Sequence, residues 1–230
     1  MVAATPSSDD LKAAIGKVPE AYSEFITIMT VEVAEVLPEH PAYDHAIDLK
    51  EGTTPPWGPR YPLNEKELEE LRNWLKKMTD MGAVRQSKFA YSSPMLFVPK
   101  GHGRGLCLCI NNRGINKITV PNHYPLPNMD ELKEPVRGAK WFNKIDLKNG
   151  YHLINIKEGD EWKTTFHCRY GLFEYTVMPF SLVNTPATFQ GMINNIFRDM
   201  LDQGMSAFMD DVIMLSDTRL GLDEITREVL

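Results

Sequence analysis

The chain has 230 residues, of which 43% are hydrophobic and 10% aromatic, so it can build a core as one large domain or two small ones. It has no apolar run of membrane-spanning length and no secretory signal pattern at its start. We therefore expect an intracellular protein, cytoplasmic or nuclear, that has no membrane partner. The net charge of −6 argues against a uniformly basic nucleic-acid-binding chain, yet residues 81–169 hold 14 Lys and Arg against 7 Asp and Glu. Such a basic block can contact phosphates, or it can be a set of scattered, solvated lysines.

The first half of the chain predicts a loosely structured beginning followed by a helix. Residues 1–59 form a lead-in that ends in an extended connector rich in Pro and Gly. A helix is predicted to begin after Asn64, with Glu67 completing a capping box and apolar residues at helical spacing behind it. Gly82 suits the end of this helix.

The second half predicts short strands and a further helix. Residues 92–100 and 105–110 flank a glycine-rich turn and predict a hairpin, while residues 141–147 and 151–156 have strand composition. Residues 185–204 predict a helix that ends at a glycine. Because strands and helices are mixed without a regular βαβ alternation, the predicted class is α+β.

The three cysteines, Cys107, Cys109 and Cys168, have no disulfide framework, which indicates a reducing compartment. Cys107 and Cys109 occupy one face of a predicted strand. We interpret them as buried small apolar residues, and a metal site is the weaker alternative.

Two adjacent acids, Asp210 and Asp211, lie inside the apolar run "SAFMDDVIML". Neighbouring carboxylates repel each other and are costly to bury. The flanking runs have strand length, so the pair predicts a two-residue hairpin turn, which by itself can be a plain surface turn. Asp146 lies at the end of another apolar strand, and if the strands are neighbours, three carboxylates converge. Such a group suits Mg²⁺ and two-metal phosphoryl transfer.

Several motifs follow one another along the chain. They are "SSPMLFVPK", "NKITVPNHYPLP", "FNKIDLKNGYHLINIKEGDEWKTTFHCRYGLFEYTVMPFSLVNTPATFQ" and "FMDDVIMLS". Together they resemble the reverse transcriptase of gypsy-type LTR retrotransposons over roughly residues 18–230. The resemblance implies a right-hand polymerase fold with fingers at 60–140 and, at 141–230, a palm with a small antiparallel sheet backed by helices. It also implies that the thumb is absent and that the chain is a C-terminally truncated piece of a polyprotein.

The resemblance further implies an RNA-directed DNA polymerase that uses dNTPs on a primed RNA or DNA template, with two Mg²⁺ ions or Mn²⁺ in their place. The implied catalytic and metal-binding residues are Asp146, Asp210 and Asp211. The implied nucleotide-binding residues are Lys100, Tyr151, Phe180 and Gln190, and Arg113 is implied to bind the template. By themselves these five could also be an exposed lysine, two aromatics, a helix-packing glutamine and a surface arginine.

The chain departs from the family pattern around the expected triphosphate site. Cys107 stands where the family has a phosphate-binding arginine, and Asn111–Asn112 stand in place of Asp-Tyr. Gly101–His102 replace Lys-Asp, and Ser181 replaces a glycine. An arginine fork suits phosphate, whereas a thiol offers little to it. The alternative prediction is therefore a catalytically inactive remnant that acts as a nucleic-acid- or protein-binding module.

Overall fold

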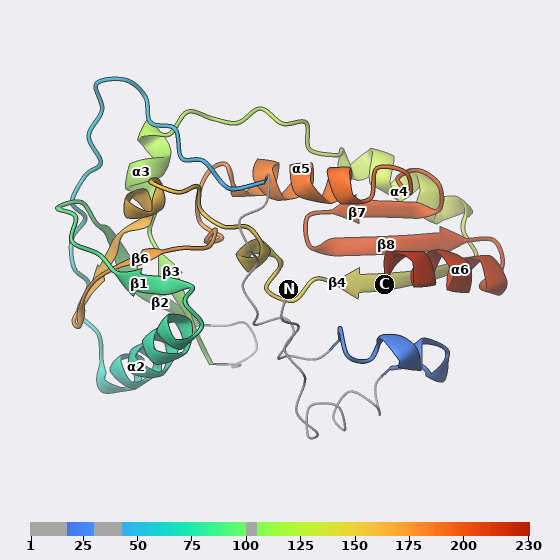
Figure 1. Cartoon of the computed structure of the whole chain (residues 1–230), viewed down its shortest axis with the longest axis horizontal. Coiled ribbons are helices and arrows are strands. Elements are labelled where there is room, and N and C mark those ends of the chain that lie inside the picture. Colours follow the sequence, from blue (N-terminus) through green and yellow to red (C-terminus); the bar gives the residue numbers. More distant parts are fainter. Residues whose placement is uncertain (1–17, 30–42, 100–104) are drawn as a thin grey trace. The chain divides into compact units, whose positions relative to one another are not determined.

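The computed structural model describes residues 18–29, 43–99 and 105–230 and shows a mixed α+β fold, which confirms the predicted class (Figure 1). Two compact units interleave along the sequence. Unit 1 comprises Met1–Val36, Tyr124–Gly150 and Pro186–Leu230, and unit 2 comprises Leu37–His123 and Tyr151–Thr185. The division into a lead-in, fingers and palm stays a prediction. Within the described ranges, no helix combines the length and the apolar character needed to cross a bilayer.

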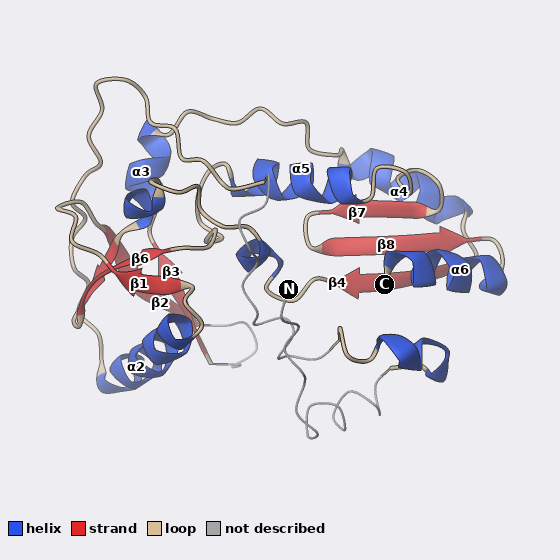
Figure 2. Ribbon diagram, in the orientation of Figure 1, coloured by secondary structure: helices blue, strands red, loops and turns tan. Residues whose placement is uncertain are grey.

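Unit 2 contains a five-stranded sheet in the order β1-β6-β5-β2-β3 (Figure 2). Its strands are β1 (Val84–Gln86), β2 (Ser93–Pro99), β3 (Leu106–Ile110), β5 (Phe166–Cys168) and β6 (Gly171–Tyr175). Neighbouring strands are antiparallel except β2 and β5, which are parallel. The predicted hairpin is confirmed as β2–β3, and helix α3 (Arg113–Ile118) follows it. β3 lies at the edge of the sheet, where Cys107 is exposed and Cys109 is half-buried. The prediction that both side chains are buried is therefore wrong.

Helix α2 (Glu65–Asp80) begins as predicted. Asn64 Oδ1 accepts from the Glu67 N–H, and Glu67 Oε2 accepts from the Asn64 N–H, both at 2.9 Å. Its apolar face packs against the sheet, and the two form one core. Each fully buried aliphatic side chain in such a core stabilises the fold by about 1.5–3 kcal/mol. The core residues include Leu71, Leu75, Met78, Val84, Met95, Phe166, Phe173 and Val177.

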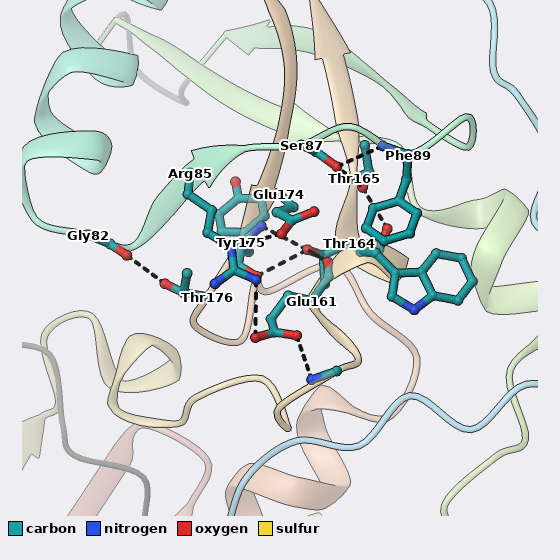
Figure 3. Close-up of polar contacts among 12 residues, drawn as sticks. Gly82, Arg85, Ser87, Phe89, Glu161, Thr164, Thr165, Glu174, Tyr175 and Thr176 are labelled. Carbon is teal, nitrogen blue, oxygen red and sulfur yellow. Dashed lines mark hydrogen bonds and ion pairs between the residues drawn. The ribbon is translucent and has the colours of Figure 1, made fainter.

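An ion pair between the half-exposed Arg85 and two largely buried carboxylates ties the sheet of unit 2 to the 3₁₀ helix η5 (Glu161–Thr164) (Figure 3). Arg85 Nε donates to Glu174 Oε1 at 2.8 Å, and a guanidinium nitrogen of Arg85 lies 3.3 Å from Glu161 Oε1. The hydrogen bond to Glu174 raises the pKa of Arg85. Because the Glu174 side chain is 6% exposed, removing Arg85 would leave a buried carboxylate without its counterion.

Unit 1 contains a three-stranded antiparallel sheet in the order β4-β8-β7, with helices around it (Figure 2). Its elements are β4 (Trp141–Asp146), β7 (Met205–Phe208), β8 (Asp211–Ser216), α4 (Met129–Gly138), most of α5 (Thr185–Ile196) and α6 (Arg219–Val229). Helix α6 packs against β8 and β4. The 3₁₀ helix η1 (Glu20–Phe25) is tied to α6, since the Tyr22 hydroxyl donates to Asp223 Oδ1 at 2.6 Å.

Two predicted elements differ from the structure, one in its end and one in its type. The helix predicted to reach Gly204 ends at Ile196, because the chain must reverse before β7 and takes positive φ angles at Asp202 (63°) and Gly204 (88°). The strand predicted at 151–156 is also wrong. A 3₁₀ helix, η4 (Gly150–Leu153), replaces its first half, because the turn before it leads directly into helical geometry.

Candidate active site

Two of the three predicted carboxylates face each other in the sheet of unit 1. Asp146 ends β4 and Asp211 begins β8, and the two are direct partners in the antiparallel register. Such partners project to the same face, with Cβ atoms about 4.5–5.5 Å apart. The turn between β7 and β8 consists of Met209 and Asp210, because Phe208 pairs with Asp211. The turn predicted at Asp210–Asp211 was therefore one residue too late, because Asp211 is paired within the central strand.

The turn that carries Asp210 is anchored on two sides. Met209 has φ +53°, a left-handed conformation that is uncommon for a residue other than glycine. Its N–H donates to Gln190 Oε1 at 2.9 Å. The Asp210 carbonyl accepts from the Leu147 N–H at 2.9 Å, which joins the turn to the residue after Asp146. One hydrogen bond to the Gln190 side chain and one backbone hydrogen bond thus hold the turn with Asp210 beside the opposed pair.

Gln190 is a fully buried residue of helix α5. Besides Met209, it contacts two further partners through Nε2, which donates to the Ala207 carbonyl at 3.2 Å and to Asn194 Oδ1 at 2.8 Å. Its observed contacts therefore connect α5 to the hairpin that bears the aspartates. The predicted role of Gln190 in nucleotide binding stays a prediction.

Lys144 supplies a positive charge to the aspartates. This role of Lys144 was not predicted from the sequence. It lies two residues before Asp146 on β4 and so projects to the same face of the sheet. Its Nζ lies 2.7 Å from Asp211 Oδ1. The hydrogen bond to Asp211 raises the pKa of Lys144, and the charges of Asp146 and Asp210 raise it further. The signal was the period-two alternation in "FNKIDL", which places Lys144 and Asp146 on one face.

The donor chemistry of this site fits a hard divalent cation. Across residues 18–29, 43–99 and 105–230, no three His, Cys, Asp or Glu side chains are arranged to hold a metal ion. Mg²⁺ nevertheless needs only one or two protein carboxylates when substrate phosphates complete its shell. Asp146 and Asp211 offer oxygen donors of this kind from directly opposed positions.

Unit 2 brings together two of the residues predicted to bind the nucleotide. The Tyr151 ring is 9% exposed and meets the Phe180 ring edge-on, with centroids 5.0 Å apart and planes at 89°. Arg113 is exposed, and its Nε donates to Asn111 Oδ1 at 2.9 Å. Lys100 lies outside the described residues. The substrate contacts assigned to these residues stay predictions.

Solved structures with the same fold are reverse transcriptases. A crystal structure of a prototype foamy virus protease–reverse transcriptase mutant matches with a TM-score of 0.74 and 18% identity, covering 98% of this chain and 31% of that one. A foamy viral protease–reverse transcriptase in complex with an RNA/DNA hybrid matches with a TM-score of 0.72 and 18% identity, covering 97% and 31%. The fold class is thus that of a reverse transcriptase, as predicted.

Sequence relatives give the family. A family model described as reverse transcriptase (RNA-dependent DNA polymerase) matches residues 98–230. The Transposon Tf2-3 polyprotein of Schizosaccharomyces pombe is 33% identical over 201 residues, covering 87% of this chain and 15% of the relative. The retrovirus-related Pol polyprotein from transposon 297 of Drosophila melanogaster is 37% identical over 167 residues, covering 71% and 16%. The chain belongs to the reverse transcriptase family, which confirms the predicted resemblance, and it spans about 15% of the length of these polyproteins.

Proposed function

We propose that this chain catalyses RNA-directed DNA synthesis, transferring a nucleotide from a dNTP to a primer 3′-hydroxyl. The observation that carries the proposal is the direct pairing of Asp146 with Asp211 beside the anchored turn at Asp210. Family membership supports the same reaction class.

In this proposal Asp146, Asp210 and Asp211 hold two Mg²⁺ ions, or Mn²⁺ in their place. When bound, such ions would activate the attacking hydroxyl and stabilise the leaving oxygen. The chain itself contributes a fixed carboxylate geometry, since Gln190 and the register of β4 with β8 hold the acids in place. Lys144 offsets part of the negative charge when no other cation is near.

The proposed substrates are a primed RNA or DNA template and a dNTP. Two solved structures with this fold are described as complexes with an RNA/DNA hybrid and with double-stranded DNA, which supports a nucleic-acid template here. Tyr151 would lie under the sugar and exclude a ribose 2′-hydroxyl, and Phe180 would cover the nucleotide. Lys100 would meet the triphosphate and Arg113 the template.

A second candidate function is a catalytically inactive module that binds nucleic acid or protein. The observation that favours it is the exposed thiol of Cys107 on β3, where the resemblance leads one to expect a phosphate-binding arginine. A thiol cannot replace the forked donors of a guanidinium.

Primer extension separates the two candidates. The purified chain is given an RNA template with a DNA primer and dNTPs, first with Mg²⁺ and then with Mn²⁺, and primer–template binding is measured in parallel. Asp211→Asn should abolish extension while binding is kept. Asp199→Asn is the matched control, because Asp199 is an exposed acid of unit 1 outside the sheet. Binding without any extension by the wild type would favour the inactive module.

A further inference from the structure

Phe180 is an exposed aromatic residue on a backbone that is fixed at both sides. Its side chain is 73% exposed. The carbonyl of Pro179 accepts from Thr185 Oγ1 at 3.0 Å, and the carbonyl of Ser181 accepts from Asn116 Nδ2 at 2.9 Å. An exposed ring on a fixed backbone loses little conformational freedom when a ligand covers it.

Asn112 holds the side chain of Ser181. Its Nδ2 donates to Ser181 Oγ at 2.8 Å, and the residue is only 2% exposed. Asn112 Oδ1 is buried and has no hydrogen-bond partner within the described part of the chain. A buried amide that uses only half of its hydrogen-bonding capacity is unfavourable compared with an apolar side chain. Its contribution at this position is therefore the contact with Ser181.

Two more asparagines continue the attachment along the same loop. Asn116 Oδ1 accepts from the Val183 N–H at 3.0 Å. Asn184 Oδ1 accepts from the Asn122 N–H at 2.9 Å, and its Nδ2 donates to the Val120 carbonyl at 2.8 Å. All these residues belong to unit 2. Three side-chain amides, those of Asn112, Asn116 and Asn184, thus clamp residues 179–185 to residues 112–122; we call them the amide clamp.

We propose that Asn112 and Asn116 are positioning residues for the incoming nucleotide. They hold Ser181, and through it they fix the neighbouring Phe180 ring against the substrate. The inference rests on the proposed function, in which Phe180 covers the dNTP. A loosened loop would also lose the edge-on contact between Phe180 and Tyr151, which are 5.0 Å apart between ring centroids.

The test compares Asn112→Ala, Ser181→Ala and the double variant with the wild type. Ser181→Ala removes one oxygen and keeps the carbonyl that Asn116 binds, so it stays informative if Asn112→Ala folds poorly. Ser87→Ala is the control, because it removes a hydroxyl contact of 3.0 Å with Thr165 elsewhere in unit 2 (Figure 3). The readouts are the KM for dNTP and kcat in primer extension, and the ¹⁹F NMR signal of 4-fluorophenylalanine at position 180.

Each single variant should raise the KM for dNTP about five-fold and change kcat by less than about two-fold, as expected when one hydrogen bond no longer fixes a binding residue. The double variant should be no worse than the singles, because both remove the same contact. The ¹⁹F signal should shift or broaden in the three variants and stay unchanged in Ser87→Ala. An unchanged KM together with an unchanged ¹⁹F signal would overturn the inference. A wild type that extends no primer would refute the proposed function instead, and the ¹⁹F signal would still decide whether the clamp positions Phe180.

Discussion

Gln190 is the side chain through which helix α5 holds the turn that carries Asp210. Gln190→Met removes the amide and keeps a side chain of similar length, which separates lost hydrogen bonds from an added cavity. The Met209 N–H then loses its acceptor at 2.9 Å, and the Ala207 carbonyl loses a donor at 3.2 Å. A buried group left unsatisfied costs about 1–3 kcal/mol, so we expect the free energy of unfolding to fall by about 2–4 kcal/mol.

The rate of synthesis should also fall, because the turn places Asp210. We expect a loss in single-turnover primer extension of about 10- to 100-fold, typical of a small displacement of a catalytic group. Urea denaturation gives the stability of each variant. Asn194→Ala is the control, because its contacts with Gln190 (2.8 Å) and Tyr124 (2.9 Å) do not include the turn. It should lose stability and keep its rate. A Gln190→Met variant with wild-type rate and stability would refute this reasoning.

Two further predictions concern charge. Lys144→Met removes the ammonium group that offsets the charge of Asp211, so Mg²⁺ no longer has to displace it. Half-maximal primer extension should therefore need less Mg²⁺ than in the wild type. A higher Mg²⁺ requirement would contradict this role of Lys144. His45 is 1% exposed, and burial lowers its pKa from 6.5 to about 4, with Asp160 opposing the shift. The unfolded chain therefore binds more protons between pH 4 and 6.5, and stability should rise with pH across this window by a total of about 3 kcal/mol. His45→Gln should flatten this rise in urea denaturation, whereas the exposed His123→Gln should not, and equal slopes in the wild type and His45→Gln would count against the assignment.

Local sequence signals were sufficient to locate several elements, but not their exact ends or register. The capping residues Asn64 and Glu67 predicted the start of α2, and the apolar run before Asp146 predicted β4. The hairpin around Asp210 was predicted one residue out of register, because composition alone does not show which residue pairs with Phe208. The helix ending at Ile196 was predicted too long, because the apolar periodicity continues into residues that turn.

Contacts between distant segments could not be predicted from local signals. Asn112 and Ser181 were interpreted separately, as two departures from the family pattern, yet they are hydrogen-bonded across 69 positions. Gln190 and Met209 meet only because α5 packs beside the hairpin. The ion pair of Lys144 with Asp211 requires the register of β4 with β8, although the alternation along β4 already placed Lys144 on the face of Asp146.

The opposed aspartates, Asp146 and Asp211, are proposed to support templated nucleotide transfer. Single-nucleotide incorporation by the purified chain, on a DNA primer annealed to RNA, tests it most directly. We expect the wild type to add the complementary dNMP with Mg²⁺ or Mn²⁺, and we expect Asp146→Asn to bind the same primer–template and add nothing. A wild type that binds the primer–template and incorporates no nucleotide with either metal would contradict the account, as would incorporation that survives Asp146→Asn.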